Sequence, residues 1–201
     1  GIDETAERLI AEGKIAPLIV VGVYNSPDRV NEYTPVADPV RGGGGAGGYG
    51  RFLVEELKPF IDATYRTRAG KAFTGVAGSS LGGLVSLHLG LTYPDVFSRI
   101  GVVSPSVGWA GAAILDEVAS SQGAGGRRIW LDMGGREGGN VDEQRGALEG
   151  ARRLRDALIG AGWQAGIDLY YLEDAQAVHN EAAWAKRAGG MLEFLFPPPP
   201  D

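Results

Sequence analysis

The sequence contains no cysteine and only two histidines in 201 residues. The absence of cysteine excludes a disulfide framework, a cysteine-ligated zinc site and a cysteine nucleophile. Two histidines without clustered carboxylates also argue against a catalytic metal site. We therefore expect neither a metal nor a cofactor.

Long apolar stretches are missing as well. No run approaches the roughly 20 residues needed to span a bilayer, and no basic segment followed by an apolar one opens the chain. We therefore expect a soluble protein without a signal peptide or a membrane partner. The compartment stays open, with a slight preference for the cytoplasm. The net charge of −6 argues against nucleic-acid binding, which needs clustered Lys and Arg.

Glycine, by contrast, is abundant, with 33 residues. This is about twice the usual share, so glycine motifs arise by chance more often than in an average chain. Residues 45–50 fit the Gly-x-Gly-x-x-Gly pattern of dinucleotide sites, but they follow a long loop rather than a strand. We do not expect a nucleotide there.

Apolar, β-branched runs alternate with segments of helical periodicity along the chain. This alternation predicts an α/β fold with a mostly parallel sheet of about five strands and helices on both faces. The length fits one domain over 1–196, followed by a proline-rich tail at 197–201. The strands are expected at about 18–24, 72–78, 99–104, 128–133 and 167–172. The helices are expected at about 2–12, 49–65, 80–93, 111–119, 142–160 and 180–194, with Pro59 bending the second.

Three segments set the expected shape of the molecule. Residues 18–24 form a continuous apolar run, which is typical of a strand buried on both faces. Residues 25–48 have no periodicity and predict a long surface loop. The 23 residues from 105 to 127 leave no room for a cap domain, so we expect an open cleft.

The segment Gly-Ser-Ser-Leu-Gly at 78–82 places Ser80 at the centre of a Gly-x-Ser-x-Gly motif. The string alone is weak in a glycine-rich chain, but an apolar strand ends at it and a helix begins directly after it. This is the strand–turn–helix elbow in which a serine hydroxyl is exposed at the carboxyl edge of a sheet. Ser80 is therefore the candidate nucleophile.

A serine nucleophile needs a base. His88 lies eight residues along the same helix, about 12 Å of helical rise from Ser80, and cannot reach it. His179 follows the last predicted strand, which suits a base that faces the same edge of the sheet. The alternative is that His179 is a solvent-exposed loop residue.

An acid must orient that histidine. Glu137 lies in the middle of the loop after the strand at 128–133, where a carboxylate can point toward the histidine loop. Asp132 is expected to be bound into the strand end, and Asp142 can cap the next helix. Glu137 is preferred and the other two stay open. The chain order of serine, acid and histidine is that of α/β-hydrolases.

Several stretches of the chain together carry a family pattern, namely 21–25 with Arg29, 32–35, 49–57, 78–84, 93–97, 104–106, 131–134 with Glu137, and 179–184. With these stretches the sequence resembles, nearly end to end, the esterase D and enterochelin-esterase-like group of α/β-hydrolases, which includes feruloyl esterases. The resemblance implies that Ser80 is the nucleophile, His179 the base and Glu137 the acid. It also implies that the Leu81 backbone N–H is one oxyanion donor.

The chain departs from this group in two places. Only Trp109 follows the Ser-Pro-Ser segment at 104–106, where the group usually has more than one tryptophan. The chain also starts at what resembles the first helix after the group's third strand, so the opening strands and the loop with the second oxyanion N–H are absent. We expect that the strands at 18–24 and 72–78 pair directly, that a partner chain fills the gap, as in a homodimer that completes the sheet, or that the chain is a fragment.

Four residues are candidates for contact with the substrate. A backbone N–H near Tyr24 or Asn25 could replace the missing oxyanion donor. Tyr24, Trp109 and Trp184 are candidate pocket walls, and each aromatic side chain could equally belong to the core.

These features predict a serine carboxylester hydrolase that acts through an acyl-enzyme. An open cleft would admit small, bulky or polymeric esters. Because the base is a histidine, activity should fall as the pH drops through about 6–7. Two alternatives remain: a weakly active or inactive relic that serves as a binding module, and an acyltransferase or thioesterase that uses the same residues.

Overall fold

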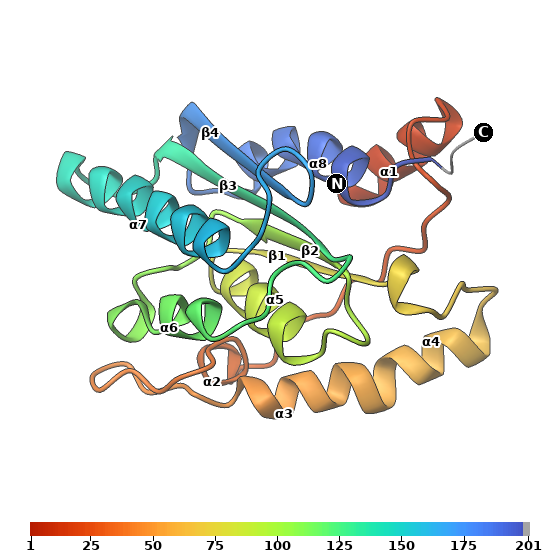
Figure 1. Cartoon of the computed structure of the whole chain (residues 1–201), viewed down its shortest axis with the longest axis horizontal. Helices are drawn as coiled ribbons and strands as arrows, with labels where there is room; N and C mark the ends of the chain where they lie inside the picture. Colours follow the sequence, from red (N-terminus) through yellow and green to blue (C-terminus); the bar gives the residue numbers. More distant parts are fainter. Residues whose placement is uncertain (199–201) are drawn as a thin grey trace.

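The computed structural model describes residues 1–198, and its centre is a parallel sheet of four strands arranged in chain order (Figure 1). The strands are β1 (Gly75–Ser79), β2 (Arg99–Val103), β3 (Arg128–Arg136) and β4 (Leu169–Val178). The parallel α/β sheet agrees with the sequence prediction, but the predicted number of five strands is wrong. Of the predicted tail, Pro199 to Asp201 lie outside the described residues.

Helices cover both faces of this sheet (Figure 1). Three helices connect successive strands: α5 (Leu81–Thr92), α6 (Ile114–Ala119) and α7 (Val141–Gly160). A 3-10 turn, η3 (Trp109–Ala112), precedes α6. The opposite face carries α8 (Glu181–Leu195), which packs against α1 (Ile2–Ala11). Because every crossover advances by one strand in the same direction, α5, α6 and α7 share one face.

A second layer of helix lies outside α5 (Figure 1). It follows the short α2 (Arg29–Glu32) and runs through α3 (Ala46–Arg51), a π-helical segment (Phe52–Leu57) and α4 (Lys58–Thr64). The π-helical segment ends at Leu57, and Pro59 is the second residue of α4, so the wider turn lies just before the residue that was expected to bend the helix. Leu53, in the π-helical segment of this layer, packs against Val85 and Leu89 of α5.

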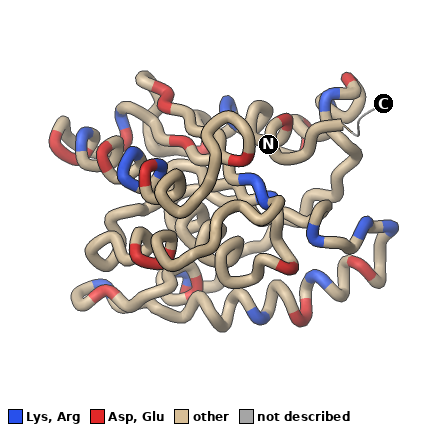
Figure 2. The backbone as a smooth tube through the Cα atoms, viewed as in Figure 1, with Lys and Arg blue, Asp and Glu red and all other residues tan. Residues whose placement is uncertain are grey.

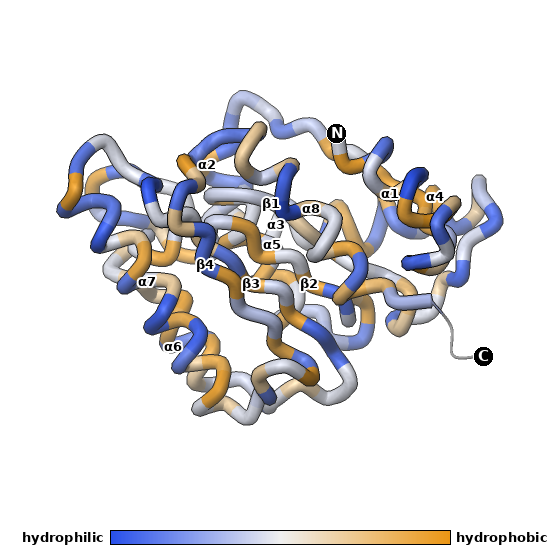
Figure 3. Tube along the Cα trace, turned by 90° about the horizontal axis from the view of Figure 1, so that it is seen from above, coloured by the Kyte–Doolittle hydropathy of each residue, from blue (hydrophilic) through white to orange (hydrophobic). Residues whose placement is uncertain are grey.

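The buried core explains these layers. Its largest cluster lies between the sheet and the α5–α7 layer, and Leu87, Ile100, Leu131 and Leu154 are four of its fully buried members. Along α7 hydrophobic and hydrophilic residues alternate (Figure 3), because one face of the helix packs on this core and the other meets solvent.

The segment at 18–24 is the main correction to the predicted fold. It is not a strand, and Ile19, Val20 and Val21 are 51%, 41% and 42% exposed. Among residues 1–198, β1 pairs only with β2, so the direct pairing of 18–24 with the 72–78 strand does not occur. An apolar run adopts strand structure only when a neighbouring strand satisfies its backbone groups, and none does so here.

The ends of the other elements differ modestly from the prediction. The segment at 71–73 is a 3-10 turn, so β1 begins at Gly75. The last strand is longer than expected because β4 continues beside β3, through an irregularity in the register, as far as Val178. The predicted helix at 111–119 is instead two elements, η3 and α6. Within η3, Ala110 and Gly111 depart from the helical conformation.

Charged residues of both signs are interspersed along α7 and along the helical layer from α3 to α4 (Figure 2). Within residues 1–198, no helix is long and apolar enough to cross a bilayer. In the same part of the chain, no group of three acidic or histidine side chains is placed to hold a metal ion.

Candidate active site

The Gly-x-Ser-x-Gly segment forms a sharp turn between β1 and α5. Ser80 stands at this turn with φ 60° and ψ −123°, a conformation that L residues rarely adopt. Glycine is required on both sides of it. A Cβ on Gly78 would lie 2.7 Å from the Gly82 backbone, and a Cβ on Gly83 would lie 2.8 Å from the Val103 carbonyl oxygen. The strained turn is therefore held between the first helical turn and the end of β2.

Helix α5 begins directly at this serine. Leu81 is its first residue, so the Leu81 N–H has no acceptor within the helix and is available to a ligand. The partial positive charge of the helix N-terminus also lies next to Ser80. Both features favour negative charge that develops on an oxygen beside the Ser80 side chain.

His179 and Glu137 are brought together from two loops that follow neighbouring strands. The His179 Nδ1 lies 2.7 Å from the Glu137 Oε2. A carboxylate can only accept, so Nδ1 carries the hydrogen and Nε2 is left with a lone pair. The edge of the Trp184 indole packs against the His179 ring, with centroids 4.9 Å apart and planes at 89°. The imidazole is thus oriented by one acid and one aromatic wall.

Glu137 is 5% exposed and fully engaged by hydrogen bonds. Its Oε1 accepts from the Gly134 N–H at 2.7 Å and from the Ser104 hydroxyl. Burial alone would raise the pKa of the Glu137 carboxyl, but the hydrogen bonds from His179, Ser104 and Gly134 outweigh it and hold the pKa below its usual value. The acid therefore stays ionised beside the imidazole.

A buried ion pair lies behind this acid. Arg187 of α8 donates through one Nη to the Ser104 hydroxyl at 2.7 Å and to Asp132 at 3.0 Å. Asp132 also accepts from the Trp130 indole at 2.6 Å. Burial raises the pKa of Asp132, against the hydrogen bond from Trp130 and the charge of Arg187. Ser104 thus connects Glu137 to a charged pair in the core, and the same Arg187 nitrogen also forms an ion pair of 3.5 Å with the Glu137 Oε1.

The other candidate acids do not contact the histidine. Asp132 lies within β3 and is fully buried, as expected for a residue bound into the strand. Asp142 is in the first turn of α7, where its side chain is 83% exposed and pairs with Arg145. Glu137 is the one carboxylate of the three that bonds to His179. The second histidine, His88, is paired with Glu117 at 2.8 Å on the α5–α6 side of the sheet.

Ser80 and His179 are not hydrogen bonded to each other in the described part of the chain. The Ser80 hydroxyl instead lies 3.4 Å from the Ser106 hydroxyl. Ser106 lines two adjoining pockets. One, of 410 Å³, also contains Leu81, and the other, of 440 Å³, also contains Glu137 and His179. Ser106 therefore stands between the serine elbow and the histidine–acid pair.

The predicted substrate-contact residues divide into two groups. Trp109 lines the smaller pocket, whereas Trp184 lines neither pocket and packs against His179. Tyr24 is 97% exposed and, like Asn25, lines neither pocket in the part of the chain that the structure describes.

Sequence reasoning missed Ser104, Ser106, Arg187 and Arg41. A signal existed for the first two, because Ser104-Pro105-Ser106 follows the carboxyl end of a predicted strand, where ligands of parallel sheets bind. No comparable signal marks Arg187, which lies within a helix, or Arg41, which lies within a glycine-rich loop.

Comparison with known proteins gives a consistent result. The family model described as "Putative esterase" matches residues 1–195. The YbbA protein of Bacillus subtilis is 26% identical over 200 residues, which cover 96% of this chain and 79% of YbbA. The ferri-bacillibactin esterase BesA of the same organism is 43% identical over 72 residues, covering 36% of this chain and 24% of BesA.

A solved structure agrees on the fold. The IroE-like serine hydrolase of Shewanella oneidensis superposes with a TM-score of 0.75 at 19% identity, over 96% of this chain and 66% of that one. No additional domain covers the carboxyl edge of the sheet within residues 1–198, and the β2–β3 connection holds only η3 and α6. The chain therefore belongs to the esterase family of α/β-hydrolases and is an ester-hydrolysing enzyme.

Proposed function

We propose that the chain hydrolyses carboxylic esters with Ser80 as nucleophile, His179 as general base and Glu137 as the acid that orients the base. The observation that carries this proposal is the Glu137–His179 hydrogen bond of 2.7 Å. It leaves Nε2 as a lone-pair base at the same sheet edge as the strained Ser80 turn. In this proposal a rotation of the Ser80 side chain away from Ser106 brings it to His179 when substrate binds.

The reaction divides into two steps. The His179 Nε2 takes the hydroxyl proton as the Ser80 Oγ forms a bond to the ester carbonyl carbon. The carbonyl oxygen becomes an oxyanion, which the Leu81 N–H stabilises. Collapse of this intermediate expels the alcohol, which receives the proton from His179. Water, deprotonated by the same nitrogen, then attacks the acyl-enzyme and releases the acid and Ser80.

The two pockets suit an ester whose acyl and alcohol parts bind in separate pockets. The pockets meet at Ser106, so the acyl and alcohol parts of one substrate can extend in different directions from Ser80. The open edge of the sheet admits small esters and bulky ones alike. Because a relative is named a ferri-bacillibactin esterase, siderophore esters belong in the first substrate screen beside simple aryl esters.

A fluorophosphonate probe tests the proposal without knowledge of the natural ester, since it requires only an activated serine. We expect stoichiometric modification at Ser80, located by mass spectrometry of the digested chain. Ser80→Ala should abolish the modification. His179→Ala should slow it by at least about 10³-fold, because the nucleophile loses its base.

Ser106→Ala is the matched control, since its hydroxyl lies beside that of Ser80. It should keep the modification at Ser80. Label found on Ser106, or label that persists in Ser80→Ala, would contradict the assignment of the nucleophile. A folded chain that no fluorophosphonate modifies would support the binding-module alternative.

A further inference from the structure

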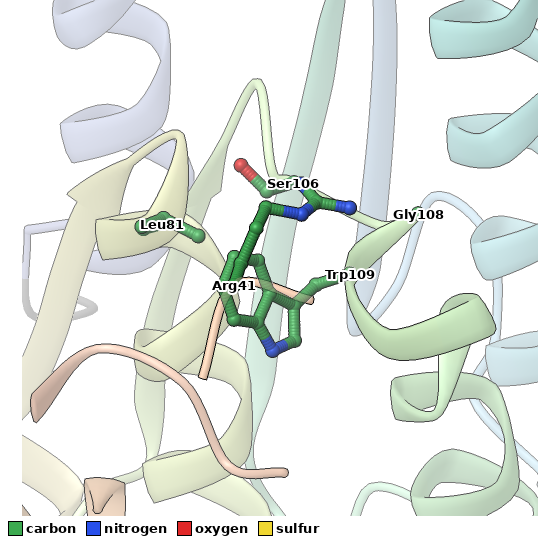
Figure 4. A pocket seen from close by; sticks show the side chains of 5 residues that line it. All are labelled: Arg41, Leu81, Ser106, Gly108 and Trp109. Atoms are coloured by element: carbon green, nitrogen blue, oxygen red, sulfur yellow. The ribbon is translucent and has the colours of Figure 1, made fainter. Parts of the chain in front are cut away.

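The pocket next to the oxyanion donor contains a cation that the proposed chemistry does not use. Arg41 lines this pocket together with Leu81, Ser106, Gly108 and Trp109. In Figure 4 the Arg41 side chain lies over the Trp109 ring, and its guanidinium extends toward the side of the pocket where Ser106 and Gly108 lie. The guanidinium carbon is 4.9 Å from the ring centroid, a cation–π distance.

Hydrogen bonds hold the loop that carries Arg41 in one conformation. The Trp109 indole donates to the Val36 carbonyl at 2.7 Å, and Asp38 and Gly42 exchange backbone hydrogen bonds of 2.7 and 2.9 Å. Thr34 is fully buried, and its hydroxyl accepts from the Gly44 N–H at 2.9 Å. Residues 34–44 therefore form a loop that is fixed over Trp109 by hydrogen bonds.

The guanidinium of Arg41 has donors to spare. Asp38 lies 3.5 Å from one Nη, beyond hydrogen-bond distance. The other Asp38 oxygen accepts from the backbone N–H groups of Val40 and Arg41, and these bonds lower the pKa of the Asp38 carboxyl. No side-chain hydrogen bond of Arg41 is made within residues 1–198. A planar guanidinium with free donors is suited to bind a carboxylate or another oxyanion.

The position of His179 decides which half of the substrate reaches Arg41. His179 must protonate the leaving alcohol, and it lines the larger pocket. The alcohol part therefore extends into the pocket with His179, while the acyl part extends past Leu81 toward Arg41.

We propose that Arg41, stacked on Trp109, forms a subsite for an anionic group on the acyl part of the ester. The substrate class is thus esters of acids that carry a second negative charge, such as half-esters of dicarboxylic acids. This inference rests on the proposed function, because Ser80 must be the centre from which the two halves diverge.

The test uses two fluorophosphonates whose alkyl chains have equal length and end in a carboxylate or in a methyl group. The quantity compared is the ratio of their second-order rate constants for modification of Ser80. We expect the wild type to prefer the carboxylate probe. Arg41→Gln should lower the ratio by about 5- to 20-fold, and Arg41→Glu should lower it further. Arg41→Lys should retain part of it.

Arg8→Gln is the control, since the Arg8 side chain is 55% exposed, close to the 62% of Arg41, but lies on α1, and the ratio should not change. A ratio in Arg41→Gln equal to that of the wild type would overturn the subsite while Ser80 labelling upholds the proposed function. If neither probe modifies Ser80 in the wild type, the proposed function fails and the subsite fails with it. High salt should reduce the wild-type preference but not the labelling by the methyl probe.

Discussion

Individual glycines in the serine turn have unequal roles. The motif in the sequence highlights Gly78 and Gly82, but the turn depends on Gly78 and Gly83. A Cβ on Gly82 would meet nothing within 4 Å, while one on Gly83 would lie 2.8 Å from the Val103 carbonyl. The local pattern therefore predicted the sharp turn at Ser80, the proposed nucleophile, but the glycine that allows close packing against β2 is visible only once the strands are assembled.

Alanine at Gly82 and alanine at Gly83 should have different effects on the free energy of unfolding. Gly83→Ala should lower the free energy of unfolding by about 1–3 kcal/mol, because the new methyl group cannot avoid the backbone of β2. Gly82→Ala should leave it unchanged or raise it by up to about 1 kcal/mol, because alanine favours the helix. Urea unfolding followed by circular dichroism measures both. Equal destabilisation by the two variants would contradict the packing of α5 on β2.

Arg187 is the residue that sequence reasoning had least chance of finding. It lies on the buried face of α8 and contacts Ser104 and Asp132, which are 83 and 55 residues away in the chain. Two of its nitrogens, Nε and Nη1, have no hydrogen-bond partner within the described residues. A buried charge with so few hydrogen bonds is costly, and its one clear contribution is to hold Glu137 in place, through Ser104 and through a direct ion pair of 3.5 Å with the Glu137 Oε1.

Removal of this cation should affect folding and rate separately. Arg187→Met leaves Asp132 as an uncompensated buried charge and should lower the free energy of unfolding by about 3–5 kcal/mol. Arg187→Met combined with Asp132→Leu should recover much of that loss. The double variant should still show a kcat about tenfold lower on an aryl ester, with little change in KM, because Glu137 is less well held. A double variant with wild-type kcat would show that the pair serves stability alone.

At the scale of elements, periodicity predicted every long helix and the strands β1 to β3 to within a few residues, and it predicted the start of β4. It failed at 18–24, because an apolar β-branched run specifies burial but not a partner. Strand pairing depends on residues distant in sequence, and within residues 1–198 this run pairs with no strand, although β1 has a free edge. The length of β4 was missed for the same reason, since its second half is stabilised by pairing with β3.

One contact between elements should make stability depend on pH. Arg152 of α7 binds Glu173 of β4 through two hydrogen bonds of 2.8 and 2.7 Å, and the Tyr171 hydroxyl donates to the same carboxylate. The hydrogen bonds from Arg152 lower the pKa of Glu173 to about 2, against the effect of burial. The ordinary value in an unfolded chain is about 4.3.

A carboxyl whose pKa is lower in the folded state stabilises the fold above the unfolded pKa and loses this effect as the pH falls through the folded one. The contribution of Glu173 to the free energy of unfolding should thus be complete above pH 5 and should be lost as the pH falls from about 4.3 to about 2. Glu173→Gln should lower the free energy of unfolding by about 1 kcal/mol at pH 7, and the difference from wild type should vanish near pH 2. Urea unfolding midpoints across this pH range measure the difference in stability.

Asp142→Asn, which breaks an exposed pair with Arg145, is the control and should change the free energy of unfolding little at any pH. A difference that stayed constant down to pH 2 would contradict the shifted carboxyl.

For the molecule as a whole, the edge of the sheet at β1 stands out. β1 has a strand partner on one side among residues 1–198, and Ile19 to Val21 expose apolar side chains. An unpaired edge and an exposed apolar run both favour association between chains. We propose that this protein self-associates through that region, as in the homodimer considered from the sequence.

Light scattering over a range of concentrations tests this proposal. We expect an average mass that rises with concentration, and a return to the monomer mass in a variant that combines Ile19→Lys with Val21→Lys. Val141→Lys is the control, since Val141 is 73% exposed but lies on α7, and it should not change the mass. A wild type that stays monomeric at high concentration would overturn the proposal.

The order of the strands has a consequence for the synthesis of the chain. Because spatial order follows chain order, each strand can join the sheet as it leaves the ribosome, from β1 to β4. The face opposite α5–α7 stays bare until α8 emerges, and α1, which precedes the sheet, must wait for its partner α8, which follows it. Arg187 arrives with α8. A nascent chain thus carries Ser80, Glu137 and His179 before Arg187 can hold Glu137 in place, so the proposed catalytic site would be ordered only after α8 has been synthesised.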